Sequence, residues 1–144
     1  MGCQTAAMAL RWYTTVIDCI DPHAQAHWWA KALDMQVFLE FDDEVVVLPR
    51  SLPTEPLTAQ TWTSVGPGMV FVTVPEAKTV KNRLHIDLAP HTSDDRDAEI
   101  DRLIALGARR VDVGQPSDAG FTVLADPEGN EFCLLRRRVE SADA

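Results

Sequence analysis

Basic residues are scarce in this chain of 144 residues, where 13 Lys and Arg stand against 22 Asp and Glu, giving a formal net charge of −9. Such a surface repels phosphate groups, which argues against nucleic acid and anionic membranes as partners. Long apolar runs are also missing, and none approaches the length of a membrane span. Hydrophobic residues nevertheless make up 46% of the sequence, enough for one domain or two very small modules that share a core.

Cysteine is also rare, with only Cys3, Cys19 and Cys133 present. Their odd number and wide spacing are typical of neither a disulfide framework nor a metal knuckle. Residues 1–10 have no basic region before their apolar residues, so we see no secretion signal and expect a cytoplasmic protein. The sequence also lacks a Ser-His-Asp order, a phosphate-binding glycine loop and a dinucleotide-binding fingerprint.

The first half of the chain predicts a strand, a helix and three further strands. Aromatic and β-branched residues favour a strand within residues 10–20. Asp21 and Pro22 are typical of a helix start, and this helix should end at Leu33. Three strands are expected after it, with a proline-rich loop over 50–67 before the last: 36–41, 44–48 and 69–74.

The second half repeats this order, with a helix over 95–106 that Ser93 or Asp94 caps and Gly107 ends. Its strands are predicted at 83–89, 109–113, 121–125 and 131–137. Because an open sheet cannot bury its face alone, we expect an α+β fold in which two βαβββ modules form a curled mixed sheet with a central cup. The chain then divides into a flexible tail (1–9), a first module (10–74), a linker (75–82), a second module (83–137) and a second flexible tail (138–144).

One histidine stands in an apolar alternation at the start of the second half. Leu84, Ile86 and Leu88 alternate with His85 and Asp87. Because side chains two apart share a face of a strand, the three aliphatic residues should be buried while His85 and Asp87 face the cup. The alternative is a half-buried strand whose His and Asp face solvent.

Five blocks of sequence carry a family resemblance: Asp18–Pro22, Val74–Lys78, Lys81–Leu88, Leu106–Ala108 and Asp126–Cys133. Over residues 10–136 the chain resembles the vicinal oxygen chelate superfamily, and within it the glyoxalase-like domain proteins. The resemblance implies paired βαβββ modules around a U-shaped cup. It also implies that metal-dependent members hold a divalent ion there, with ligands from the first and last strand of each module.

Compared position by position, most of that implied ligand set is absent. The first strand offers Thr14 or Val16, and residues 69–74 contain no carboxylate or imidazole. His85 matches the third position, while Cys133 stands where a Glu is expected and Glu131 lies two residues earlier on the same face. The metal candidates are therefore His85, Glu131 and Cys133, which could suit a softer ion such as zinc but leave its ligand set incomplete.

We therefore expect a protein that binds a small molecule in its cup, without the complete metal site. The alternative is a metal-dependent lyase, isomerase or dioxygenase that uses His85 with Glu131 or Cys133. A cluster of carboxylates around His85 could serve acid–base catalysis or only fix strand register. A homodimer is also expected, since two-fold dimers are the commonest assembly. The candidate pocket residues are Trp12, Thr14, Asp18, His85, Asp87, Glu131 and Cys133.

Overall fold

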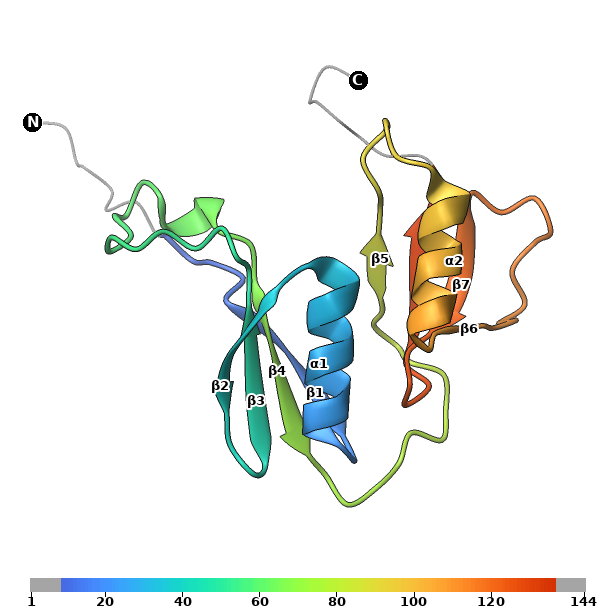
Figure 1. Ribbon diagram of the computed structural model, residues 1–144, viewed down its shortest axis with the longest axis horizontal. Coiled ribbons are helices and arrows are strands. Elements are labelled where there is room, and N and C mark those ends of the chain that lie inside the picture. The colour runs from blue at the N-terminus through green and yellow to red at the C-terminus, as the bar shows by residue number, and fades with distance from the viewer. Residues whose placement is uncertain (1–8, 137–144) are drawn as a thin grey trace, which may run out of the picture. The chain divides into compact units, whose positions relative to one another are not determined.

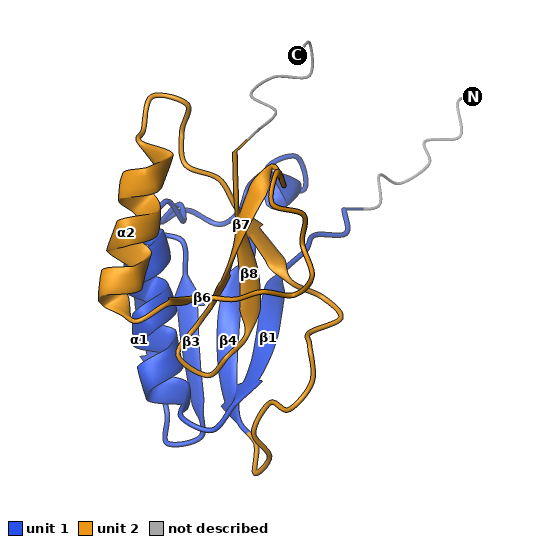
Figure 2. Ribbon diagram, turned by 90° about the vertical axis from the view of Figure 1, so that its right-hand side faces the viewer, with its two compact units in different colours: residues 1–73 blue, residues 74–144 orange. Residues whose placement is uncertain are grey.

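The computed structural model describes residues 9–136, which form parts of two compact units divided between Thr73 and Val74. Figure 2 colours the first unit blue and the second orange. Cys3, nearly all of the predicted N-terminal tail and the predicted C-terminal tail lie outside the described residues. Each unit contains one α-helix and one four-stranded mixed sheet, which confirms the α+β class and the two βαβββ modules (Figure 1). The central cup stays a prediction.

The sheet of the first unit has the strand order β1-β4-β3-β2, in which β1 runs parallel to β4 and the other neighbours are antiparallel. Its helix α1 contacts β3 and β4 and lies against one face of the sheet (Figure 1). A short 3-10 helix, η1, interrupts the predicted loop. The elements of this unit are β1 (Thr14–Cys19), α1 (Pro22–Leu33), β2 (Gln36–Glu40), β3 (Glu44–Leu48), η1 (Trp62–Ser64) and β4 (Gly68–Thr73).

Helix α1 begins and ends where the sequence predicts. The Asp21 side chain accepts a hydrogen bond from the Ala24 N–H, and Pro22 follows it at the first helical position. Trp28 and Trp29 pack edge to face with ring centroids 5.1 Å apart. Only 7% of Trp28 and 3% of Trp29 is exposed. The two rings therefore belong to the core, where they fix the helix.

The sheet of the second unit has the order β5-β8-β7-β6, with β5 parallel to β8. Helix α2 is capped by Asp95, so the prediction that Ser93 or Asp94 caps it is wrong by at least one residue. Arg96 ties α2 to the sheet by donating to the Thr122 hydroxyl and the Leu134 carbonyl. The elements of this unit are β5 (Ile86–Leu88), α2 (Arg96–Leu106), β6 (Arg109–Arg110), β7 (Phe121–Ala125) and β8 (Glu131–Leu135).

Strand β5 is shorter than predicted. It contains only Ile86–Leu88, and Leu84 is 90% exposed. The expectation that Leu84 is buried with Ile86 and Leu88 is therefore wrong. The alternation of residue types continues for longer than the pairing with β8, which reaches only from Ile86 to Leu88. Among residues 9–136 no helix is long and apolar enough to cross a membrane.

Candidate functional site

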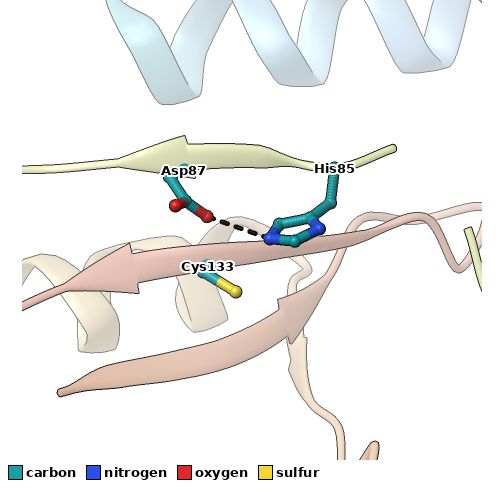
Figure 3. Close-up of side chains that lie close together, drawn as sticks. All are labelled: His85, Asp87 and Cys133. Atoms are coloured by element: carbon teal, nitrogen blue, oxygen red, sulfur yellow. Dashed lines mark ion pairs between the residues drawn. The ribbon is translucent and has the colours of Figure 1, made fainter. Parts of the chain in front are cut away.

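The pairing of β5 with β8 brings two chemically active side chains to one place. In the parallel register Asp87 stands opposite Cys133, so both side chains lie on the same face of the sheet. His85 precedes the strand and lies two residues before Asp87, which puts its ring on that face as well. Figure 3 shows the three side chains gathered beside one another. One potential ligand atom from each of them lies within 4.8 Å of the others.

Close polar contacts connect these three side chains. His85 Nε2 lies 3.1 Å from Asp87 Oδ1. Burial raises the pKa of the Cys133 thiol, the charge of Asp87 and a hydrogen bond to its carboxylate raise it further, and only Lys81 acts in the opposite direction. The metal-free thiol is therefore protonated near neutral pH and is a poor nucleophile. Its proton would have to leave before the sulfur could bind a metal ion.

Glu131 lies on the same face but has partners of its own. Its carboxylate accepts hydrogen bonds from Lys78 Nζ at 2.9 Å and from the Asn82 N–H at 3.0 Å. Burial opposes the ionisation of Glu131, but these bonds outweigh burial and the pKa is lowered. Asn82 also donates to the Asn130 side chain. Glu131 thus fixes the segment that leads into His85.

A cavity of about 370 Å³ opens on this face of the second sheet. Its polar lining includes Lys81 and Gln115 besides His85, Asp87 and Glu131. Apolar side chains from β7, β8 and the loop after β6 complete it: Val113, Phe121, Val123 and Leu135. The alternation along β7 and β8 explains this lining, because Leu124, Phe132 and Leu134 point to the other face and are buried there.

The predicted site residues are divided between the units. His85, Asp87, Glu131 and Cys133 all line this pocket of the second unit. Trp12, Thr14 and Asp18 belong to the first unit, where Thr14 and Asp18 lie on β1 and Trp12 precedes it. For these three a role in binding stays a prediction.

Sequence reasoning did not include Asp87 among the candidate metal ligands, and it missed the pocket residues Lys81, Gln115 and Phe121. The period-two pattern already put Asp87 beside His85, and that signal could have added it to the candidate ligands. Gln115 gave no comparable signal, because it lies in the loop between β6 and β7, within neither strand. Its amide is held there by bonds with the Val113 N–H and the Val111 carbonyl.

The donor set of the trio fits one kind of metal ion. An imidazole nitrogen, a carboxylate oxygen and a thiol sulfur are the ligand types that zinc accepts, and three protein ligands with an open position are typical of catalytic zinc sites. Hard ions such as magnesium prefer oxygen ligands and are disfavoured by the sulfur.

Comparisons with known proteins agree on one family. The model of the glyoxalase-like domain family matches residues 14–135. A search of curated proteins gave no match. Among solved structures, a glyoxalase/bleomycin resistance protein/dioxygenase family enzyme from Burkholderia phytofirmans PsJN is 15% identical, with a TM-score of 0.61 over 87% of this chain and 97% of its own.

Two further structures are similar at comparable levels. A possible glyoxalase from Bacillus cereus is 12% identical, with a TM-score of 0.62 over 88% of this chain and 99% of its own. A mutant of the fosfomycin resistance protein FosX from Listeria monocytogenes, complexed with Mn(II) and 1S,2S-dihydroxypropylphosphonic acid, is also 12% identical, with a TM-score of 0.63 over 92% of this chain and 94% of its own. At these identities the likeness shows the fold alone.

Proposed function

The chain belongs to the glyoxalase-like domain family, within the vicinal oxygen chelate superfamily, and we propose that it binds a small organic molecule in the pocket of its second unit. The observation that carries this proposal is the pocket itself. Its volume of about 370 Å³ lies within the usual range for small-molecule sites. An apolar wall with a few convergent polar groups is also the usual composition of such sites.

The lining indicates the chemistry of the ligand. Val113, Phe121 and Val123 suit an apolar or planar body, with the Phe121 ring available for stacking. Polar groups of the ligand would face His85, Asp87 and Lys81, which can donate and accept hydrogen bonds. A compact ligand with an apolar body and one polar group is therefore expected.

Blocking the pocket should abolish ligand binding without unfolding the protein. Val113 is half-buried at the pocket wall, so Val113→Trp should fill the cavity. Val80→Trp is the matched control, because Val80 is exposed and does not line the pocket. A panel of small aromatic and polar metabolites, screened by thermal shift, identifies the ligand. At a hundredfold excess over Kd it should stabilise the protein by about 2.7 kcal/mol.

The two tryptophan variants then decide whether the ligand uses this pocket. Titration calorimetry should show at least about tenfold weaker binding to Val113→Trp and unchanged binding to Val80→Trp. The reason is that losing the apolar contacts between ligand and pocket wall costs more than about 1.4 kcal/mol of binding free energy. Equal binding to all three proteins, or no response to any compound, would reject the proposal. Thermal shift is preferred over tryptophan fluorescence because all four tryptophans belong to the first unit.

The trio of His85, Asp87 and Cys133 favours a second candidate, a metal-dependent lyase, isomerase or dioxygenase. These side chains would hold the ion, with Asp87 taking the place that the sequence assigned to Glu131. A bound zinc ion would supply Lewis acidity, which suits a lyase or an isomerase, whereas a dioxygenase would need a redox-active ion in its place. The residues of the chain would then orient the substrate: Lys81 and Gln115 by hydrogen bonds and Phe121 by packing.

The homodimer stays a prediction at this point. Val16 and Ile20 are exposed apolar side chains on and just after β1, an edge strand of the first sheet, which supports an apolar contact with another chain.

A further inference from the structure

A second cluster of titratable side chains lies in the first unit, on residues that do not line the pocket. His23 and His27 are separated by four positions in helix α1, so their side chains project from one face of the helix. Glu40 ends β2, the strand that follows α1. His23 Nδ1 lies 2.8 Å and His27 Nε2 lies 2.9 Å from the same oxygen, Glu40 Oε1. One carboxylate oxygen is thus hydrogen-bonded to two imidazoles.

We propose that His23, His27 and Glu40 form a binding site for a divalent transition-metal ion, with zinc as the expected occupant. Two imidazoles and one carboxylate are a recurrent ligand set for zinc and non-haem iron, in which water takes the remaining positions. Neighbouring ligand atoms around a zinc ion are about 3.0–3.5 Å apart, given bond lengths near 2.1 Å. The two nitrogen–oxygen separations are hydrogen-bond lengths slightly below that spacing. Among the described residues only the pocket trio has three ligand atoms within 4.8 Å of one another, so the two ring nitrogens here must move closer together before one ion can bind both.

The surroundings of the cluster also favour a cation. The carboxylate of Glu40 lies beside both rings, and the charge of Asp21 acts on the His23 ring. A dication would therefore enter a negatively charged environment.

The backbone beneath the cluster is already in place. Helix α1 is fixed by the buried Trp28 and Trp29, and β2 is paired with β3 along the edge of the sheet. The ligand side chains themselves are exposed, with 43% of His23, 52% of His27 and 39% of Glu40 accessible. Exposed side chains can rotate to exchange the two hydrogen bonds for bonds to an ion, and the ion can enter directly from solvent.

Histidine ring signals in nuclear magnetic resonance locate the ion without reference to any activity. The chain has four histidines, and Zn²⁺ added to the full-length protein should shift the ring signals of His23 and His27 together. His91 is the internal control, because its ring is bonded to Ser93 and lies outside both clusters. A response of His85 would report the pocket trio separately. Unchanged His23 and His27 signals under excess Zn²⁺ would overturn the proposal.

Calorimetry with Zn²⁺ on three variants gives the affinity. A His85→Ala background removes the pocket trio, so the remaining binding belongs to the proposed site. Within it, His27→Gln should weaken binding by about tenfold or more, since even outer-shell partners contribute 10–100-fold. Glu40→Gln should weaken it as well. All three positions are exposed, so the variants should keep the circular dichroism of the parent. Equal affinity of His27→Gln and its parent would sink the proposal.

Discussion

Replacing Glu131 with Ala is expected to lower the free energy of unfolding by about 2–4 kcal/mol, because the change leaves buried partners of a charged group unsatisfied. Only 12% of the Glu131 side chain and 20% of the Lys78 side chain are exposed, so their ion pair is shielded from water. The substitution also leaves the Asn82 N–H without its acceptor. Denaturant unfolding of the two proteins measures the difference.

Two further variants separate the charge from the packing. Glu131→Gln keeps an acceptor but removes the charge, so about half of the loss is expected. Glu55→Ala removes an exposed carboxylate from a loop and should change stability by no more than about 0.5 kcal/mol. A Glu131→Ala protein as stable as the Glu55→Ala control would mean that the Lys78 pair contributes nothing to folding.

The contribution of Glu131 to the free energy of unfolding should depend on pH in a defined direction. The pKa of Glu131 is lower in the folded protein than its ordinary value of 4.5, so its ionisation favours the folded state. The contribution is fully present above pH 4.5 and disappears as the pH falls through the lower folded pKa. The stability difference between the parent and Glu131→Gln should therefore shrink in acid. A difference that grows below pH 4.5 would contradict the lowered pKa.

The bounds of local elements followed from sequence wherever a single residue type decides them. Asp21 and Pro22 start α1 as predicted, because an N-cap acceptor and a proline ring act on the backbone next to them. The ends of the strands were predicted less accurately from the sequence. Leu84 fits the apolar alternation, yet it is 90% exposed because pairing with β8 begins only at Ile86. The end of a strand depends on its partner, which local propensity does not contain.

In the candidate site, too, features within one strand could be predicted, whereas contacts between distant segments could not. Period two placed His85 and Asp87 on one face, since that inference needs only the strand itself. The neighbour of Asp87 is Cys133, 46 positions later in the chain, and only the parallel register between β5 and β8 brings them together. Lys78 likewise meets Glu131 through the path of the linker, with 53 positions between them. Contacts of this range depend on the whole fold and could not be predicted from spacing.

Replacing His85 with Ala is expected to weaken binding in the pocket by about tenfold or more while changing the free energy of unfolding by about 1 kcal/mol or less. The asymmetry follows from the position of the ring. The His85 side chain is 43% exposed and its contact with the half-exposed Asp87 is open to water, so it adds little to the core. It nevertheless lines the pocket and supplies the nitrogen of the trio.

The His85→Ala variant tests both candidate functions of the pocket. Calorimetry measures the affinity for the ligand from the thermal-shift screen. Co²⁺ added as a zinc substitute reports the trio, because a bond to Cys133 gives a thiolate absorption band that His85→Ala should weaken. His91→Ala is the matched control, an exposed histidine outside the pocket whose loss should change neither quantity. If His85→Ala instead unfolds the protein and leaves binding per folded molecule unchanged, His85 is a structural residue and the site lies elsewhere in the chain.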